Sequence, residues 1–273
     1  MDELMQIFYR ELEGIDFGVY GIFDTSDTIH TLGTDSKIIG RVFEMYLEPV
    51  VARVAARFGL QHFTPEAQTH YPDFVLLNPT HPYTPDKIAL DVKTTYITTP
   101  GSAIKFTLGA FGSYMRDNNK NIAFPYTDFV KHYVIGIVYR RNAAAQASAE
   151  YPFAQRGCIT PPFSDVRCFI QEKYKIAGDK PGSGNTENIG SISTNNFDAF
   201  VYGYGPFSEL GQDVYDIYWK YYPKYRSLDR PYTSLQEFFA WIPANIHRVE
   251  LFRPINKDDI MQRIQSYRYT HQV

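Results

Sequence analysis

The sequence predicts an α/β (α+β) protein with a mixed central β-sheet flanked by helices. Three observations predict this class. Apolar residues recur every three or four positions over residues 35–58, which indicates a long amphipathic helix. The pattern then becomes strand-like over residues 73–77 and 87–96, and a continuous apolar run over residues 133–139 is typical of a buried strand. Helical spacing returns in the last third of the chain, so we expect one domain with a smaller appended lobe.

The other elements are expected in the following order along the chain. Asp35 or Thr34 caps the long helix, Pro49 could kink it, and Gly59 ends it. Before this helix we expect a helix over residues 2–12 and a strand over 17–23. After it we expect further strands over 104–108, 166–171 and 174–177 and then a loop over 178–191. Helices are expected at the end of the chain, over 213–222, 234–241 and 258–267.

Composition excludes several classes of protein. The 273 residues carry 27 Lys plus Arg and 30 Asp plus Glu, a net charge of −3, so there is no uniform cationic coat for nucleic acid. Two cysteines, Cys158 and Cys168, are too few for a disulfide framework and match no common zinc spacing. No apolar run is long enough to cross a bilayer and the first residues are charged, so we expect a cytoplasmic protein without a membrane partner.

The segment 87–93 alternates between apolar and charged residues. In a strand, Asp91 and Lys93 share one face with Ala89, while Leu90 and Val92 point to the other. An acid and an amine at this spacing could hold a metal-bound water. The alternative is an exposed ion pair on an edge strand, which has no function beyond solubility.

A second carboxylate, in the pair Pro72-Asp73, lies at the start of the strand expected over residues 73–77. If the two strands form a hairpin, Asp73 and Asp91 converge and could bind a hard cation such as Mg²⁺. Such an arrangement suits phosphodiester hydrolysis, because the ion neutralises charge on the phosphate. Asp86 also follows a proline, but it is too close to Asp91 for a separate strand and turn.

Two polar segments are candidates for nucleic-acid contacts. The Gly-rich stretch 182–188 could present amides and hydroxyls to base edges in a major groove, or it could be an ordinary solvated loop. Arg116, Lys120 and Lys131, with neighbouring asparagines, could form a phosphate-binding patch or a solvated helix end.

In this order, these motifs make the chain similar to the EcoRV-type restriction endonucleases of the PD-(D/E)XK nuclease superfamily. The similarity extends from about residue 21 to residue 241. It rests on Phe43-Glu44, His70-Tyr71-Pro72-Asp73-Phe74, Asp91-Val92-Lys93-Thr94-Thr95-Tyr96, Lys105-Phe106-Thr107-Leu108-Gly109, Lys120-Asn121-Ile122, Ile176-Ala177-Gly178-Asp179, Gly182-Ser183-Gly184-Asn185-Thr186 and Asn188-Ile189-Gly190-Ser191.

The resemblance implies a role for each matched residue. Asp73 and Asp91 are the expected metal ligands, with Glu44 as an auxiliary acid and metal ligand at the edge of the site, and Lys93 is the expected catalytic lysine. The expected major-groove loop consists of Gly182, Ser183, Gly184, Asn185 and Thr186, and the expected minor-groove loop of Gln68 and Thr69. Four further positions are expected to contact the DNA backbone or to couple recognition to cleavage: Thr94, Thr107, Ser113 and Lys120.

The resemblance also implies an assembly and a reaction. We expect a restriction-endonuclease-like fold and a U-shaped homodimer that clasps double-stranded DNA, with a dimerisation lobe at about residues 17–34 and 143–165. The expected cofactor is Mg²⁺, with Mn²⁺ as a substitute, and the expected reaction is a blunt central cut of GATATC that leaves 5′-phosphate ends. A DNA methyltransferase is the expected genetic partner, not bound to the protein, in a prokaryotic cell.

Some residues depart from the family pattern. Ala67 and Thr69 stand where larger amides are expected, Glu187 places an acid beside the major-groove loop, and Pro181 stiffens its entrance. The residues from about 245 to 273 form an extension of unknown role. A different target therefore stays open, as do two other activities: a catalytically silent DNA-binding relative and a structure-selective repair nuclease.

Overall fold

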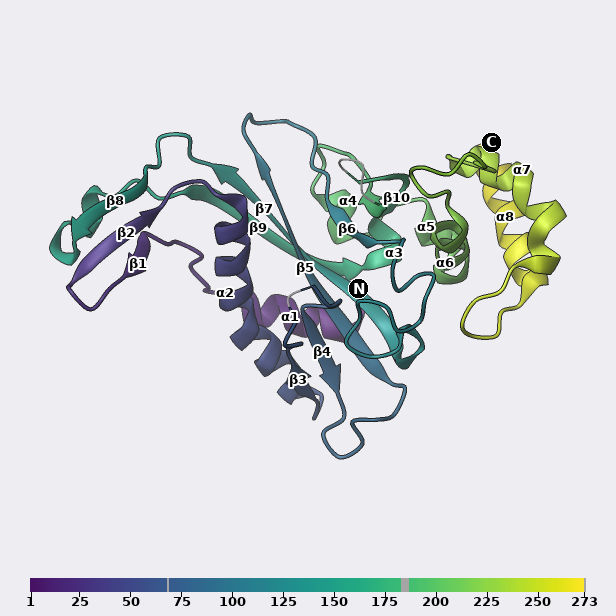
Figure 1. Ribbon diagram of the computed structural model, residues 1–273, viewed down its shortest axis with the longest axis horizontal. Coiled ribbons are helices and arrows are strands. Elements are labelled where there is room, and N and C mark those ends of the chain that lie inside the picture. Colours follow the sequence, from purple (N-terminus) through teal and green to yellow (C-terminus); the bar gives the residue numbers. More distant parts are fainter. Residues whose placement is uncertain (68, 183–186, 273) are drawn as a thin grey trace.

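A mixed five-stranded sheet forms the centre of the computed structural model, which describes residues 1–67, 69–182 and 187–272. Its strands follow the order β3 (Gln61–Phe63), β4 (Phe74–Leu77), β5 (Lys87–Ile97), β7 (Phe129–Arg141) and β9 (Phe163–Glu172). Only β5 and β7 pair in parallel, and the other neighbours are antiparallel. Helices lie around this sheet (Figure 1), so the predicted fold class is confirmed.

Two helices, α1 (Glu3–Leu12) and α2 (Ser36–Arg57), cover one face of the sheet. Phe43 and Leu47 of α2 pack with Leu90 and Ile135 of the central strands in one buried cluster. The predicted long helix is confirmed: the Asp35 side chain caps its first turn, and Pro49 lies inside the helix. Gly59 follows the helix with a φ of +66°, which a residue with a side chain rarely adopts.

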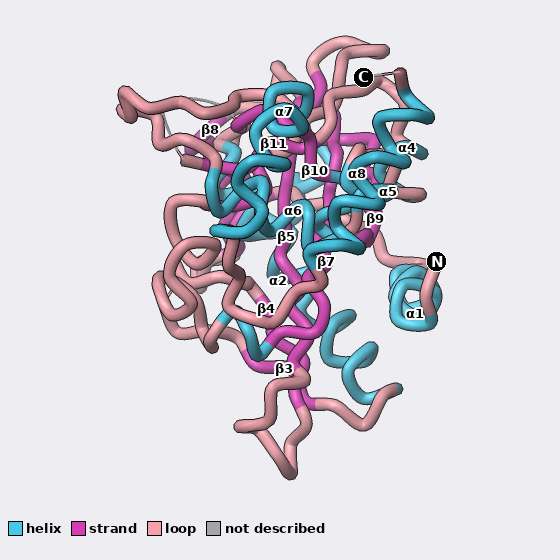
Figure 2. The backbone as a smooth tube through the Cα atoms, turned by 90° about the vertical axis from the view of Figure 1, so that its right-hand side faces the viewer, coloured by secondary structure: helices cyan, strands magenta, loops and turns pink. Residues whose placement is uncertain are grey.

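The opposite face of the sheet is covered by the second half of the chain. Here Ala89 and Val134 pack with Phe169 and Trp219 in a second buried cluster. Figures 1 and 2 show the last helices grouped at one end of the molecule. The helices on this side are α4 (Asp198–Val201), α5 (Phe207–Leu210), α6 (Gln212–Tyr221), α7 (Leu235–Asn245) and α8 (Lys257–His271).

A separate three-stranded sheet projects from the other end of the molecule (Figure 1). It contains β1 (Gly21–Phe23), β2 (Thr28–Leu32) and β8 (Ala147–Pro152), followed by the 3-10 helix η2 (Phe153–Cys158). Because β2 pairs with β8, the sheet brings together the two segments that were predicted to form a dimerisation lobe. That role stays a prediction.

Several sequence-based expectations were wrong in detail. The strand expected over residues 17–23 covers only 21–23, and the strand expected over 104–108 is β6 (Thr107–Ala110). Residues expected as a strand over 174–177 form the short helix α3 (Lys173–Ile176). The expected loop over 178–191 contains two strands, β10 (Ala177–Pro181) and β11 (Asn188–Ser191), because pairing of β11 with β6 outweighs the low strand propensity of its residues.

The C-terminal extension packs against the domain. Ile260 and Ile264 of α8 are buried, and Arg263 donates a hydrogen bond to the carbonyl of Leu210 at 2.7 Å. Short 3-10 helices are also present at η1 (Tyr126–Asp128) and η3 (Ile246–Arg248). Among the described residues, no helix combines the length and apolar character needed to span a bilayer.

Candidate active site

The two predicted carboxylates converge on neighbouring strands. β4 and β5 are antiparallel and pair Phe74 with Leu90, so Asp73 and Asp91 come next in the ladder. The Oδ2 atom of Asp73 accepts a hydrogen bond from the main-chain amide of Val92 at 2.7 Å. The hairpin predicted from the sequence is therefore confirmed.

Lys93 lies between the two aspartates. Its Nζ atom is 2.8 Å from Oδ1 of Asp91 and 3.9 Å from Oδ2 of Asp73, and it donates a hydrogen bond to the carbonyl of Val92 at 3.0 Å. The alternative of an exposed edge pair is wrong, because β5 lies between β4 and β7 and Asp91 is only 3% exposed.

Burial and charge shift the pKa values of this group. Burial is the main cause that raises the pKa of Asp73 to about 7, although Lys93 acts in the opposite direction. Burial alone would lower the pKa of Lys93, but the neighbouring carboxylates, Asp91 foremost, hold it above its ordinary value. The site therefore favours the presence of positive charge beside the aspartates.

A second lysine, Lys173 of α3, contacts the same group and was missed from the sequence. Its side chain is buried, and Nζ lies 3.6 Å from Oδ2 of Asp91. Burial lowers the pKa of Lys173 to about 8, against the attraction of Asp91. No sequence pattern separates Lys173 from the neighbouring Lys175, so only the fold reveals it.

The aspartates can bind a divalent cation. Oδ2 of Asp91 is buried, and no described residue donates a hydrogen bond to it. A buried carboxylate oxygen without a partner is costly, and hard cations such as Mg²⁺ prefer oxygen ligands of this kind. Asp73 and Asp91 therefore fit such an ion. Among the described residues, however, no three acidic, histidine or cysteine side chains are close enough together to hold a metal.

Glu44 lies in the cleft next to the aspartates, and its charge adds to the larger effects of burial and of the nearer charges on the pKa values of Asp73 and Lys93. Its Oε2 atom accepts a hydrogen bond from Arg41 at 2.7 Å within α2. It lines a cleft of about 430 Å³, and His70 and Asp73 line both this cleft and the one at the aspartates. Its predicted role as an auxiliary acid at the edge of the site stays a prediction.

The cleft at the aspartates, of about 190 Å³, also contains predicted DNA contacts. Thr69 and Ser113 line it, and the hydroxyl of Ser113 donates a hydrogen bond to the carbonyl of Lys120 at 2.7 Å. Thr94 lies on β5 beside Gly40 of α2, away from this cleft. Gln68 lies outside the described residues.

The base of the predicted major-groove loop is attached to the same cleft. Gly182 lies against Thr107, and its amide donates a hydrogen bond to the carbonyl of Asn188 at 2.8 Å. The carbonyl of Glu187 accepts a hydrogen bond from the amide of Phe111 at 2.8 Å, two residues before Ser113. The predicted contacts Ser183, Gly184, Asn185 and Thr186 lie outside the described residues.

The predicted phosphate patch is not continuous. Arg116 turns inward and donates a hydrogen bond to the carbonyl of Tyr222, and Lys131 forms an ion pair with Glu172. Lys120 is exposed. Of these three cations, Lys120 is the one whose exposure suits a phosphate contact.

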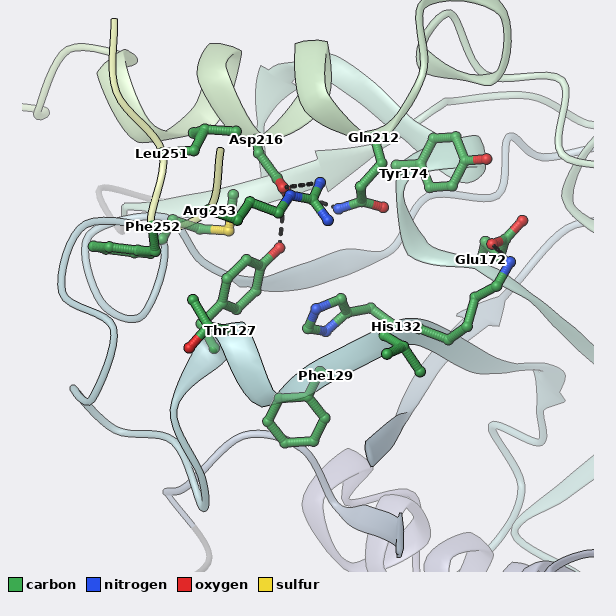
Figure 3. A pocket seen from close by; sticks show the side chains of 14 residues that line it. Thr127, Phe129, His132, Glu172, Tyr174, Gln212, Asp216, Leu251, Phe252 and Arg253 are labelled. Carbon is green, nitrogen blue, oxygen red and sulfur yellow. Dashed lines mark hydrogen bonds and ion pairs between the residues drawn. The ribbon is translucent and has the colours of Figure 1, made fainter. Parts of the chain in front are cut away.

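A separate cavity of about 260 Å³ lies on the side of the C-terminal extension (Figure 3). Leu251, Phe252 and Arg253 of the extension line it together with Asp216, and His132 and Phe129 lie across from them in Figure 3. Arg253 forms an ion pair with Asp216 at 3.1 Å. The extension thus packs against the domain at this cavity. The cavity is separate from the candidate active site, because neither Asp73 nor Asp91 lines it.

Comparison with known proteins decides the family. Residues 13–243 match the family model described as restriction endonuclease EcoRV. Over 242 residues the chain is 38% identical to the type II restriction enzyme EcoRV of Escherichia coli. The aligned region covers 88% of this chain and 96% of that protein.

The chain belongs to the EcoRV family of restriction endonucleases. It is therefore a type II restriction endonuclease, a site-specific deoxyribonuclease, as the sequence motifs predicted. The family match ends at residue 243, so the extension from about residue 245, which lines the cavity in Figure 3, lies beyond the part shared with the EcoRV family model.

Proposed function

We propose that this EcoRV-family enzyme hydrolyses phosphodiester bonds of double-stranded DNA in a Mg²⁺-dependent reaction at the cleft of Asp73, Asp91 and Lys93. One observation carries the proposal: both carboxylates lie within 4.0 Å of the Lys93 ammonium, and Oδ2 of Asp91 is left without a hydrogen-bond donor among the described residues. A silent DNA-binding relative would have no need of this costly arrangement.

Each side chain has a distinct part in this reaction. Asp73 and Asp91 would hold the cation, with Asp73 fixed by the Val92 amide. Lys93, which is 23% exposed, can reach the attacking water or a phosphate oxygen and hold it by charge and hydrogen bonding. When bound, Mg²⁺ would neutralise the charge that develops on the phosphate. Glu44 would act only from the neighbouring cleft.

We further propose a symmetric homodimer joined through the lobe at about residues 17–34 and 143–165. Ile22, Phe23 and Phe153 of the lobe are exposed, as is Met45 of the adjacent α2. Exposed apolar side chains gathered in one region favour burial against another copy. Two-fold symmetry would give each subunit one half-site and one strand to cut, as a palindrome requires.

The proposed target is GATATC, cut bluntly at its centre to leave 5′-phosphate ends. The loop over residues 182–186 would read the major groove, and Gln68 and Thr69 the minor groove. The hydrogen bonds that attach Glu187 to Phe111 and Gly112 give the loop a direct connection to the cleft. The enzyme would work in a prokaryotic cytoplasm, with a methyltransferase that protects the host DNA, and Mn²⁺ would replace Mg²⁺.

Digestion of a long duplex of known sequence, followed by mapping of the ends, tests this proposal. We expect discrete fragments with blunt 5′-phosphate ends at GATATC in Mg²⁺ or Mn²⁺, and intact DNA in excess chelator. Discrete fragments cut at another sequence would show that the target is not GATATC but would still support the proposed reaction. Cleavage in chelator, or nicking only at junctions and ends, would contradict the proposal.

A further inference from the structure

Lys173 is a buried cation behind the candidate active site, with three close neighbours. Its Nζ atom donates a hydrogen bond to the hydroxyl of Tyr114 at 3.0 Å and lies 3.9 Å from the centre of the Tyr71 ring. The third neighbour is Oδ2 of Asp91 at 3.6 Å, too long for a hydrogen bond. Lys173 therefore faces Asp91 as a charge without using the lone pairs of that oxygen.

The two oxygens of Asp91 are thus treated differently. Oδ1 lies 2.8 Å from Lys93, at hydrogen-bond distance, whereas no described residue donates to Oδ2. Lys93 is partly exposed in the cleft, but Lys173 is only 2% exposed. Lys173 cannot touch a DNA substrate from this position, so any effect on the reaction must pass through Asp91.

An aromatic cage holds Lys173 in place. The rings of Tyr71 and Tyr114 stack with their centres 4.4 Å apart, and the hydroxyl of Tyr71 lies 2.9 Å from Nδ1 of the buried His132. Tyr71 is also two residues before Asp73 in the chain. A cation held by its own hydrogen bond and a ring face cannot move freely onto Asp91.

We propose that Lys173 is a positioning residue that balances the buried charge of Asp91 while leaving Oδ2 free to bind a divalent cation. This inference rests on the proposed Mg²⁺-dependent function. The Tyr114 hydroxyl accepts one of the three N–H donors of Lys173 and thereby holds the ammonium at 3.6 Å from Oδ2 of Asp91. Without the Tyr114 hydroxyl, the ammonium is free to move onto Oδ2 and compete with the metal; without Lys173, the Tyr114 O–H is no longer oriented by an incoming donor and is free to turn toward Asp91.

Three variants test this arrangement: Lys173→Met, Tyr114→Phe and the double variant. The affinity for Ca²⁺ is measured by calorimetry on the complex of the dimer with duplex DNA, with a gel to verify that the duplex stays intact. We expect each single variant to weaken the affinity by about tenfold, as for other partners of metal ligands. The double variant removes both competitors and should bind Ca²⁺ within about threefold of the wild type, a non-additive result.

The matched control is Lys175→Met, on the same helix, whose partly exposed lysine pairs with the buried Glu172 and not with Asp91. It should leave the Ca²⁺ affinity and the Mg²⁺ dependence of cleavage unchanged. A purely electrostatic effect of Lys173 predicts tighter metal binding when its charge is removed, and a purely structural effect predicts the same affinity with a lower melting temperature. Either result, or additive losses in the double variant, overturns the inference.

The Tyr114→Phe variant keeps the test usable if Lys173→Met does not fold, because it removes one hydroxyl and no buried charge. An unchanged Ca²⁺ affinity in Tyr114→Phe is then sufficient to overturn the inference. If the wild-type complex cleaves DNA with Mg²⁺ and binds Ca²⁺ but neither single variant weakens binding, only the role of Lys173 fails. If the wild type binds no divalent ion, the proposed function fails as well.

Discussion

Asp73 accepts a hydrogen bond from the main-chain amide of Val92, the residue between Asp91 and Lys93. This bond joins the residue just before β4 to the middle of β5 and fixes the first carboxylate against the strand that carries the second. It uses one carboxylate oxygen of an aspartate whose pKa is already raised to about 7 by burial. The two acids of the hairpin are thereby held together before any cation is present.

The raised pKa of Asp73 predicts a pH-dependent stability. Between the unfolded pKa of 3.8 and about 7, the folded protein keeps a proton that the unfolded chain releases, so the free energy of unfolding falls as pH rises through this window. In chelator at pH 8, Asp73→Asn should raise the free energy of unfolding by about 2 kcal/mol, since partial exposure screens part of the effect. Urea unfolding at pH 5 and pH 8 measures this difference.

The control for this prediction is Asp229→Asn, which alters an exposed carboxylate away from the cleft. It should leave the pH dependence unchanged. If Asp73→Asn destabilises the chelated protein equally at both pH values, burial does not set the ionisation of Asp73.

Gly112 has no room for a side chain at the base of the major-groove loop. A Cβ atom there would lie 1.9 Å from Oε2 and 3.0 Å from Cβ of Glu187. Gly112→Ala should therefore displace Glu187 and reduce the rate of cleavage at the target by about tenfold or more, because small displacements strongly affect catalysis. Single-turnover cleavage and binding of nonspecific DNA measure the two effects, and binding should change much less.

The double variant Gly112→Ala/Glu187→Ala removes the displaced side chain and should recover most of the lost rate. If the double variant is as slow as Gly112→Ala alone, the clash with Glu187 is not the cause.

The exposed apolar side chains of the lobe predict a dimer contact. Ile22 is 62% exposed on β1, so Ile22→Glu costs little in a monomer but places a charge in the proposed interface. We expect the variant to sediment as a monomer at micromolar concentration and to lose double-strand cleavage. Leu228→Glu, at an exposed apolar residue outside the lobe, is the control. If the Ile22→Glu variant forms dimers as stable as those of the wild type, the interface does not include this part of the lobe.

The C-terminal extension should stabilise the domain through Arg253. Its guanidinium lies 3.1 Å from Oδ2 of Asp216, a buried acid whose pKa is raised to about 6 by burial. Arg253→Met should lower the free energy of unfolding by about 2 kcal/mol at pH 8, where the charged Asp216 keeps its hydrogen bonds from Tyr126 and Gln212 but loses its ion pair with Arg253. The loss should shrink at pH 5, where the carboxyl is protonated in the folded protein. Arg248→Met is the control, and urea unfolding measures both variants.

How far the sequence predicts the site depends on the range of the contacts. Asp91 and Lys93 could be placed on one face because side-chain alternation is a local property of a strand. Asp73 required one further step, the pairing of two strands joined by a short turn. These contacts are close in the chain, and the structure confirms them.

The contacts that the sequence did not predict are long-range. Lys173 reaches Asp91 only because β9 pairs with β7, which lies beside β5. β10 and β11 consist largely of glycine and small or polar residues, so their strand conformation depends on each other and on β6. Glu44, expected from the resemblance as an auxiliary acid at the edge of the site, lies in the next cleft beside Asp73, and Arg41, three residues earlier on α2, pairs with it. Its role stays a prediction.

The central claim is that Asp91 binds the cation that activates cleavage. The most direct test compares wild type and Asp91→Asn on the same target duplex across a Mg²⁺ titration, with Ca²⁺ binding by calorimetry as a second readout. We predict Mg²⁺-dependent cleavage by the wild type, and in Asp91→Asn a folded dimer that binds DNA but neither cleaves it nor binds Ca²⁺ with wild-type affinity. Full cleavage by Asp91→Asn, or equal cleavage with and without Mg²⁺, would contradict the claim.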